Sequence, residues 1–448
     1  MERTLYHELT EWKNRPSRLP LIVRGARQVG KSFLIEQLGK REFEQLHVIN
    51  FEKQPQLATC FNSLDPKNIP KELELQAGIQ VKTGTSLLFF DEIQDCPQAL
   101  KALRYFAEEM PEQHVIAAGS LLEFILEDKA FSFPVGRVEI MNLGPLTFSE
   151  YLLAQGEQAL NELLQTGSEI SEAVHKRLLE FVREFFCIGG MPGIVANFVK
   201  QQSFLEARRQ QSAILDLYAL DFGKYATRYA EHRHLKKLFE MAPNLIGKHF
   251  KYSKIDPNCA NPARDFREAL IRLQQARLIL PVHQTRGNGL PLRAEKNEKK
   301  FKIFLLDIGL LSSALGWESL HMKESVALFR GVAAEQFVAQ QLCTLQDPFI
   351  EKGLYYWENS ERSSSAEIDF LINLKERMLP IEVKSGPTGR LKSLRQFMKD
   401  KGVNIGLKIS ESPLDFKDGI LSVPFYLIGE INRLVETIAL KEPTARHD

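Results

Sequence analysis

The sequence predicts an α/β protein with several domains, the first of which is built on a parallel sheet. Three observations lead to this fold class. One apolar run ends in a glycine-rich loop, a second ends in two carboxylates, and 448 residues are enough for two or three domains. A hydrophobic content of 44% and a charged content of 26% are typical of a folded, water-soluble chain.

The glycine-rich loop follows residues 20–23, which predict a buried strand, and precedes residues 33–38, which predict a helix. It matches G-x-x-x-x-G-K-[ST], the phosphate-binding P-loop, in which backbone amides surround phosphate oxygens. The lysine of this pattern reaches the β- and γ-phosphates, and the hydroxyl residue contacts Mg²⁺. We therefore expect ATP and Mg²⁺ to bind here, through Gly25, Gly30, Lys31, Ser32 and Phe33.

The second apolar run, residues 87–90, ends in Asp91 and Glu92. Four consecutive apolar residues predict a strand buried on both faces, as in a parallel sheet covered by helices. The carboxyl end of this strand would lie beside the P-loop, where Asp91 would hold Mg²⁺ and Glu92 would orient and deprotonate the attacking water. The alternative is an acidic pair at the start of a solvated helix, and the preceding P-loop favours the catalytic interpretation.

Two further residues are candidates for contacting the γ-phosphate. Ser120 ends a predicted strand over residues 114–120 and would be a sensor if that strand lies between the two described above; its alternative is a helix N-cap. Arg137 lies between a glycine and a strand-like run, which makes it a candidate arginine finger for its own or a neighbouring subunit. The alternative for Arg137 is a surface salt bridge.

Charge and cysteine content limit the partners and the compartment. The net charge of +1 gives no overall attraction to nucleic acid, so any such binding must come from local basic patches. The five cysteines contain no C-x-x-C pair, which argues against a zinc site or a disulfide framework and fits a reducing cytoplasm. No stretch approaches the ~18 apolar residues of a membrane helix, so we expect a cytoplasmic protein without membrane contact.

These motifs, together with the segment Leu143-Gly-Pro-Leu-Thr-Phe-Ser-Glu150, resemble the AAA+-related ATPases of bacteria and archaea. In that family a P-loop domain is followed by a C-terminal domain of unknown function related to restriction endonucleases. The resemblance covers nearly the whole chain and implies an ATPase core over residues 1–150. It also implies a helical lid over residues 151–230, where residues 188–193 carry a Gly-Gly-x-Pro turn. Because AAA+ relatives often act as rings, a homo-oligomer with the arginine supplied in trans is an open alternative.

Residues 231–315 have the element order of a winged helix. Two amphipathic helices are predicted over residues 234–245 and 262–276, followed by the strands of a hairpin over residues 278–283 and 300–306. Duplex DNA would meet basic residues on the second helix and in the hairpin loop, namely Arg264, Arg267, Arg272, Arg286, Arg293 and Lys296. The alternative is a packing module whose basic residues are solvated.

Residues 316–448 carry a second candidate site. Asp369 and Glu382 lie on two consecutive predicted strands, and Lys384 follows Glu382 by two residues. Residues i and i+2 of a strand point to the same face, so this carboxylate and this ammonium group would lie together. The layout suits metal-dependent phosphodiester cleavage, with Asp369 and Glu382 as Mg²⁺ ligands and Lys384 positioning the attacking water. Glu335, on the preceding helix, is a further candidate ligand.

Asp369, Glu382 and Lys384 resemble the PD-(D/E)xK nuclease pattern, although isoleucine rather than proline precedes Asp369. The alternative is a nuclease-like fold kept as a binding platform, with its charges joined in a salt bridge.

The complete prediction is an α/β P-loop NTPase sheet with a helical lid, followed by a winged helix and a restriction-endonuclease-like α/β domain. We expect ATP hydrolysis that is coupled to the binding of double-stranded DNA or to its Mg²⁺-dependent cleavage. The alternative is an ATP-driven switch that does not cleave and that binds a protein partner.

Overall fold

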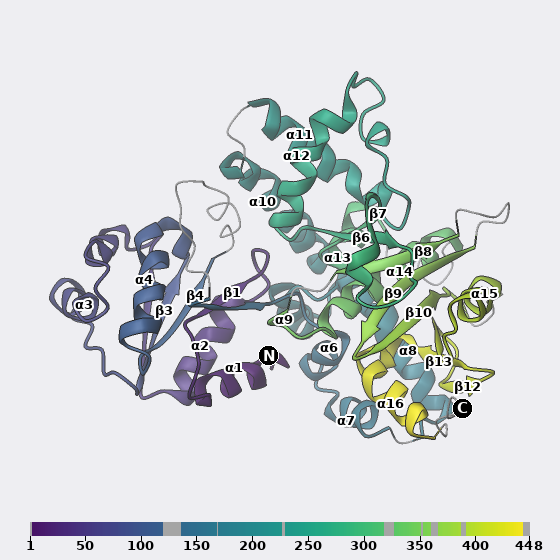
Figure 1. Ribbon diagram of the computed structural model, residues 1–448, viewed down its shortest axis with the longest axis horizontal. Coiled ribbons are helices and arrows are strands. Elements are labelled where there is room, and N and C mark those ends of the chain that lie inside the picture. Colours follow the sequence, from purple (N-terminus) through teal and green to yellow (C-terminus); the bar gives the residue numbers. More distant parts are fainter. Residues whose placement is uncertain are drawn as a thin grey trace. The chain divides into compact units, whose positions relative to one another are not determined.

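The computed structural model describes most of the chain, which forms two compact units. The N-terminal unit contains residues 1–145 and the short segments Gln275–Leu278 and Asp347–Glu351, and the C-terminal unit contains the rest (Figure 1). The described residues are 2–119, 136–167, 169–225, 229–317, 327–350, 353–359, 366–386 and 391–441.

The N-terminal unit is a five-stranded sheet with helices on both faces. Its strands are β1 (Leu21–Arg24), β2 (Gln45–Asn50), β3 (Ser86–Asp91), β4 (His114–Ala118) and β5 (Glu139–Asn142). Their order is β2-β3-β4-β1-β5, and all neighbouring pairs are parallel. The helices are α1 (Leu5–Asn14), α2 (Lys31–Glu42), α3 (Ile69–Ala77) and α4 (Pro97–Glu109), with the 3-10 helices η1 (Pro55–Phe61) and η2 (Ile93–Asp95). The strand β4 therefore lies between β1 and β3, as the sensor hypothesis requires.

Strand β3 explains why this sheet is covered on both faces. Its residues 87–90 are all fully buried. The ring of Phe90 contacts Phe61 of η1 and Phe106 of α4, with centroids 5.2 and 6.3 Å apart. Alternate residues point to the other face, where α2 contacts β3. The continuous apolar run thus predicted both the strand and its burial, and this prediction is confirmed.

The C-terminal unit begins with a series of helices. They are α6 (Phe148–Ala154), α7 (Gln158–Thr166), α8 (Glu172–Ile188), α9 (Pro192–Gln201), α10 (Phe204–Tyr225), α11 (Tyr229–Met241) and α12 (Pro262–Gln275). Phe148 and Phe185 contact Phe337 of the later helix α14 (Ala327–Thr344), with ring centroids 6.3 and 5.7 Å away. These helices therefore share a core with the C-terminal part of the chain, and their role as a lid stays a prediction.

An eight-stranded mixed sheet completes the C-terminal unit, in the order β12-β13-β11-β10-β9-β8-β6-β7. Its strands are β6 (Ile279–Thr285), β7 (Lys296–Leu305), β8 (Leu354–Glu358), β9 (Glu367–Leu374), β10 (Arg377–Val383), β11 (Gly406–Ser410), β12 (Asp415–Lys417) and β13 (Ile420–Pro424). The accompanying helices are α13 (Ile308–Ala314), α15 (Lys392–Lys401) and α16 (Ile431–Lys441), with the 3-10 helices η3 (Ala242–Leu245), η4 (Tyr252–Lys254), η5 (Leu292–Glu295) and η6 (Phe425–Glu430). Among the described residues, no helix combines the length and the apolar character that crossing a bilayer requires.

The hairpin expected to form a wing belongs to this larger sheet. Strands β6 and β7 pair in antiparallel fashion, as predicted, but β6 also pairs in parallel with β8. Phe304 of β7 contacts Phe370 of β9, with ring centroids 5.6 Å apart. A separate winged-helix domain over residues 231–315 is therefore not confirmed, because the apolar side chains of its strands complete the core of the C-terminal sheet.

The Gly-Gly-x-Pro turn packs against a buried carboxylate. A Cβ atom on Gly189 would lie 2.1 Å from Asp307 Oδ1, and one on Gly190 would lie 2.4 Å from the Leu146 carbonyl oxygen. The fully buried Asp307 accepts hydrogen bonds from the Gly190 amide at 2.7 Å and from Gln340 Nε2 at 3.0 Å. The glycines thus allow close approach of the turn to α13 and α14, beyond the backbone freedom that they supply.

Candidate functional site

The P-loop connects β1 to α2 and surrounds the ammonium group of Lys31 with backbone. Gly30 has a φ of 92°, a left-handed conformation that favours glycine, directly before α2. A Cβ atom on Gly25 would lie 2.3 Å from the Leu143 carbonyl oxygen, so a side chain does not fit there. Lys31 Nζ donates hydrogen bonds to the carbonyl oxygens of Gly25 and Ala26, both at 2.9 Å. Both loop glycines are thus required by the backbone geometry.

Ser32 and Asp91 meet at the carboxyl ends of the strands. Ser32 Oγ donates to the Asp91 carboxylate and lies 3.1 and 3.2 Å from its two oxygens. Asn50, the last residue of β2, donates its Nδ2 to Asp91 Oδ2 at 3.0 Å. Hydroxyl and carboxylate oxygens are hard ligands of the kind that Mg²⁺ prefers, so Ser32 and Asp91 fit a shared Mg²⁺.

Burial perturbs both charged groups of this site. It lowers the pKa of Lys31 to about 8, although the carboxylates of Glu92 and Asp91 oppose this effect. Burial and the charge of Glu92 raise the pKa of Asp91, although Ser32 and Asn50 donate hydrogen bonds to it. A triphosphate would favour the charged form of Lys31, and a cation would favour the charged form of Asp91. The site therefore fits a nucleotide with Mg²⁺.

Glu92 follows β3 in a left-handed backbone conformation, with a φ of 50°. Such conformations in residues other than glycine cost of order 1–3 kcal/mol and are concentrated at functional sites. Gln94 Nε2 donates to Glu92 Oε2 at 2.6 Å and so orients the carboxylate. A Cβ atom on Gly119 would lie 2.3 Å from Gln94 Oε1, so this glycine makes room for Gln94. Ser120, the expected sensor, lies outside the described residues.

Arg137 lies at the edge of the sheet opposite the P-loop. It precedes β5, whose Glu139 is paired with Leu21 at the start of β1, whereas the P-loop follows the end of β1. Arg137 Nε donates to Glu108 Oε1 at 2.7 Å, and 50% of its side chain is exposed. The structure therefore contradicts a contact with the γ-phosphate in the same subunit and supports the surface ion pair. A role of Arg137 in a neighbouring subunit stays a prediction, as does the contribution of Phe33, which is 58% exposed.

Six ionisable side chains gather in the C-terminal unit, and we name them the acidic cluster. They come from α14, from strands β7, β9 and β10 and from the residue after β10, and they are the carboxylates of Glu335, Glu367, Asp369 and Glu382 and the ammonium groups of Lys302 and Lys384. In the antiparallel pairing of β9 and β10, Ile381 lies opposite Phe370. The next residues along, Glu382 and Asp369, are therefore neighbours across the two strands.

Ion pairs of Lys302 and Lys384 join members of the acidic cluster. Lys384 Nζ lies 2.5 Å from Glu382 Oε1, as the i, i+2 spacing predicts. Lys302 Nζ pairs with Glu367 and lies 4.0 Å from Glu335 Oε2. The structure thus brings together the predicted residues of this site and adds an ion pair that the sequence analysis did not foresee.

The carboxylates of the acidic cluster are incompletely paired. Glu335 Oε2 and Glu382 Oε2 are buried without a hydrogen-bond partner. Burial and the charge of Asp369 raise the pKa of Glu335 to about 8 and that of Glu382 to about 7. Asp369 Oδ2 accepts a hydrogen bond from the Val383 amide at 2.8 Å, and burial raises the pKa of Asp369 as well. A divalent cation would stabilise these carboxylates in their ionised form, so they fit Mg²⁺.

No group of three His, Cys, Asp or Glu side chains within the described ranges is arranged to hold a metal ion. Mg²⁺ is usually bound by one or two carboxylates, with water and substrate phosphates as its other ligands.

Comparison with known families identifies part of the chain. Residues 17–152 match an AAA domain family. With the parallel sheet and the P-loop geometry, this match confirms the predicted AAA-type P-loop ATPase domain. Residues 179–321 and 330–428 match two domains of unknown function, DUF8612 and DUF4143, and neither match confirms a restriction-endonuclease-like domain. The search of curated proteins gives no match.

Similarities to solved structures are weak. The RuvB Holliday junction branch migration motor from Thermotoga maritima is 17% identical, with 61% of this chain and 86% of that chain covered and a TM-score of 0.27. A signal transduction ATPase with numerous domains, PH0952 from Pyrococcus horikoshii, is 14% identical, with 77% and 45% covered and a TM-score of 0.27. Protein VC1899 from Vibrio cholerae is 11% identical, with 94% and 97% covered and a TM-score of 0.21. These TM-scores are too low to establish a common overall fold.

The sequence did not predict a site role for four residues around the two sites, namely Asn50, Gln94, Lys302 and Glu367. Asn50 ends a strand that neighbours β3. A polar residue at the end of an apolar run can indicate a site residue at the carboxyl end of a strand. Lys302 lies within the apolar run 301–305, and a lysine buried in a strand is expected to have an acidic partner, which here is Glu367. Gln94 lies in the turn after β3 and carries no such signal.

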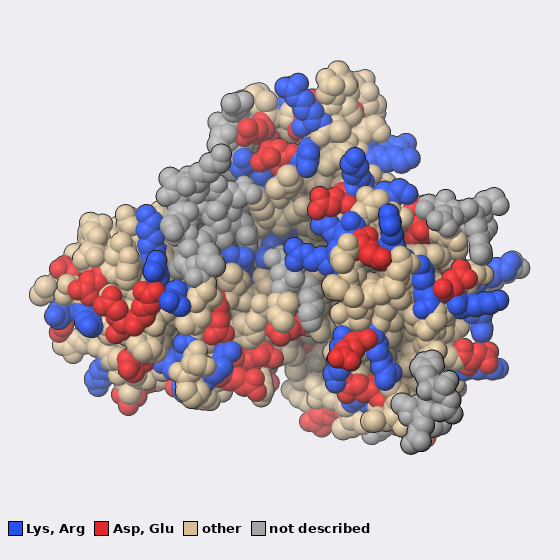
Figure 2. Space-filling view, in the orientation of Figure 1, with Lys and Arg blue, Asp and Glu red and all other residues tan. Residues whose placement is uncertain are grey.

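Basic residues are exposed on α12 and α15. Arg264 and Arg267 of α12 are exposed, and so are three residues of α15, Lys392, Arg395 and Lys399. Figure 2 shows Lys and Arg side chains over the region of α15, with few acidic residues among them. Arg395 forms an ion pair with Asp418 at 3.3 Å, and contact of these basic residues with DNA stays a prediction.

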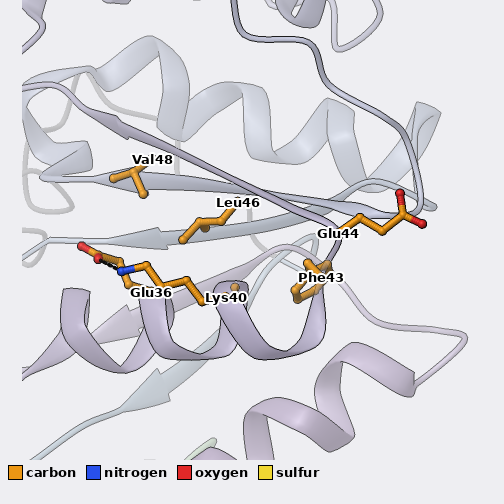
Figure 3. Close-up of a pocket in the computed structure, with 7 residues that line it drawn as sticks. Glu36, Lys40, Phe43, Glu44, Leu46 and Val48 are labelled. Carbon is orange, nitrogen blue, oxygen red and sulfur yellow. Dashed lines mark hydrogen bonds and ion pairs between the residues drawn. The ribbon is translucent and has the colours of Figure 1, made fainter.

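A shallow groove beside β2 contains none of the residues expected to bind nucleotide (Figure 3). It is lined by Glu36, Gly39, Lys40, Phe43, Glu44, Leu46 and Val48, and Glu36 and Lys40 form an ion pair at 2.9 Å. Because β2 is the outermost strand on its side, the groove runs between α2 and the open edge of the sheet.

Proposed function

We propose that the AAA domain binds and hydrolyses ATP with Mg²⁺, and that ATP turnover controls Mg²⁺-dependent cleavage of double-stranded DNA by the acidic cluster. The observation that carries this proposal is the contact between Ser32 and Asp91 beside the buried Lys31. Its cleavage part is supported by the unpartnered carboxylate oxygens of Glu335 and Glu382.

In the AAA domain, Lys31 would exchange its two backbone carbonyl acceptors for the β- and γ-phosphates. Ser32 and Asp91 would hold Mg²⁺, which neutralises phosphate charge when bound. Glu92, oriented by Gln94, would accept a proton from the water that attacks the γ-phosphate.

In the acidic cluster, Asp369 and Glu382 would hold Mg²⁺, which polarises a phosphoryl oxygen when bound. Lys384 would position the attacking water and stabilise the negative charge that develops on the phosphate. Exposed basic residues of α15 would contact the DNA backbone, which gives affinity without reading the sequence.

Nicking of a supercoiled plasmid tests the cleavage proposal. We would compare the unsubstituted protein with Lys384→Ala, in Mg²⁺ or Mn²⁺ and with or without ATP. Lys417→Ala, a change of an exposed lysine on β12, is the matched control. We expect nicking by the unsubstituted protein and the control, a loss of nicking in Lys384→Ala, and a change in rate with ATP. If the unsubstituted protein does not nick under any of these conditions, cleavage is excluded and the ATPase proposal stands.

A second candidate function is an ATP-driven switch that binds a protein partner and does not cleave. It is favoured by the two ion pairs, Lys384 with Glu382 and Lys302 with Glu367, which satisfy part of the acidic cluster without a cation. Stimulation of ATP hydrolysis by DNA would favour the first proposal, and an ATPase rate that is indifferent to both DNA and RNA would favour the switch.

A further inference from the structure

We propose that the acidic cluster accepts a single divalent cation, held by Asp369 and Glu382, and that the ammonium group of Lys302 takes the place of a second cation beside Glu335 and Glu367. This inference rests on the proposed function, because it takes the acidic cluster as the cation site. It adds how many cations the site accepts and which residue sets that number.

The position of Lys302 carries the argument. Strand β7 is separated from β9 by β6 and β8 in the sheet order, yet Lys302 Nζ pairs with Glu367 of β9. The sheet is therefore curved enough for this side chain to reach across it. The same Nζ lies 4.0 Å from Glu335 Oε2 and 5.3 Å from the centroid of the Tyr356 ring. Lys302 is only 3% exposed, so its charge is enclosed between these groups.

The backbone and a histidine hold this arrangement in place. Isolated bridges join Ile246 to Ile303 and His249 to Lys302, on the strand that carries the lysine. His249 Nε2 lies 3.4 Å from Glu367 Oε2, and His249 Nδ1 lies 3.2 Å from the hydroxyl oxygen of Tyr356. The carboxylate of Glu367 thus already contacts Lys302 Nζ and His249 Nε2, and it is not available to a metal ion in this arrangement.

Glu382, which also belongs to the acidic cluster, is 7% exposed, and its Oε2 atom has no hydrogen-bond partner. Asp369 is its neighbour across the strands. This buried, unpartnered oxygen beside a second carboxylate marks where a cation would lie.

The spacing of paired metal ions also favours one cation. Two-metal sites place their ions about 3.5–4 Å apart, and such an ion beside Glu335 and Glu367 would meet the Lys302 ammonium group.

Counting bound Mn²⁺ ions tests this proposal. The full chain would carry Asp91→Asn, which removes the P-loop cation ligand, and would be titrated with Mn²⁺ without nucleotide, followed by electron paramagnetic resonance. With Lys302 present we expect one bound ion, which is lost on Asp369→Asn. With Lys302→Met we expect a second ion and a spin-coupled signal from the pair. The double variant Lys302→Met/Glu367→Gln is the matched control and should bind one ion, because a ligand of the second site is gone.

Two bound ions in the protein that retains Lys302 would overturn the inference and leave the proposed function standing, and so would a single ion in Lys302→Met. Binding that does not depend on Asp369, or no binding at all, would overturn the metal site of the proposed function and this inference with it. Lys302→Gln replaces Lys302→Met if circular dichroism shows the methionine variant to be unfolded. The ion counts of the protein with Lys302 and of the Lys302 variant decide the claim together.

Discussion

The P-loop site and the acidic cluster differ in how their lysines are paired. In the P-loop site Lys31 donates only to backbone carbonyl oxygens, and burial lowers its pKa to about 8. In the acidic cluster both lysines are already paired with carboxylates, and burial raises the pKa of Glu335 to about 8. Lys31 thus donates to neutral acceptors, which suits an anionic ligand, whereas Glu335 Oε2 and Glu382 Oε2 lack a hydrogen-bond partner, which suits a cation.

The two sites also differ in how the chain builds them. The P-loop motif is a continuous stretch whose strand, loop and helix follow one another. The acidic cluster draws its residues from four separate elements between Lys302 and Lys384. A variant that changes one activity alone would show that the two sites work separately, and a variant that changes both activities would show that they are coupled.

The largest effect is expected for Lys31→Ala. The charge that reaches the phosphates is removed, so ATP hydrolysis should fall by at least about 100-fold. Phosphate release and calorimetric ATP binding would measure it. Lys40→Ala, on the exposed side of the same helix, is the control and should keep the original rate. Full activity in Lys31→Ala would remove the assignment of the P-loop site.

A comparable loss is expected at the other site for Asp369→Asn. Plasmid nicking should fall by at least about 100-fold, because a ligand charge is removed, while ATP hydrolysis without DNA should stay within about twofold. Asp415→Asn, on the exposed strand β12, is the matched control. An equal fall in both activities would show that the two sites are not separable.

A smaller effect is expected for Asn50→Ala. Asn50 positions Asp91 without belonging to the motif, and loss of such an outer partner typically costs about 10–100-fold in metal affinity or activity. We expect a fall of about tenfold in the ATPase rate, partly restored by higher Mg²⁺ concentration. Asn62→Ala, an exposed asparagine after η1, should have no effect. A rate that does not change would leave Asn50 with a packing role only.

The smallest effect concerns stability and pH. The raised pKa values of Glu335 and Glu382 mean that the folded state holds protons that the unfolded carboxyl groups, with a pKa of 4.5, release. Without divalent cations, the stability that these groups contribute is present below pH 4.5 and is lost as the pH rises through about 8. We expect a loss of at least about 1 kcal/mol in the opening free energy of β9 and β10 between pH 5 and pH 8.

Hydrogen exchange of the β9 and β10 amides, corrected for the intrinsic rate at each pH, would measure this loss. Glu335→Gln should flatten the dependence, because its side chain does not titrate, and Mg²⁺ should reduce it. An opening free energy that rises with pH would contradict the assignment of raised pKa values.

Short sequence patterns predicted the features that depend only on residues close together in the chain. Residues 87–90 predicted β3 and its burial, and the G-x-x-x-x-G-K-[ST] pattern predicted the turn between β1 and α2. The spacing of Glu382 and Lys384 predicted their ion pair, because side chains alternate along a strand.

Features that depend on distant partners were not predictable in this way. The flanking residues of Arg137 do not say at which edge of the sheet it lies, and this depends on the pairing of β5 with β1. The sequence predicts the same two strands for a free hairpin as for one that pairs with β8, so the winged helix was a reasonable but unconfirmed interpretation. Lys302 was missed because its partner Glu367 comes from another hairpin.

The parallel pairing of β6 with β8 also limits the order in which this chain can fold during synthesis. Val282 is paired with Leu354, and the segment between them has to emerge from the ribosome before that pair can form. The strands of the N-terminal sheet, in contrast, are all available once Asn142 has emerged. Until then, the β6 edge of the β6–β7 hairpin is unpaired and carries residues that are buried in the finished fold, such as Ile279 and Val282. An unpaired apolar edge of this kind is a template for aggregation. On the outer strand β7, residues 301–303 are joined to residues 246–250, and the exposed Lys299 and Lys300 protect the part of this edge that precedes them.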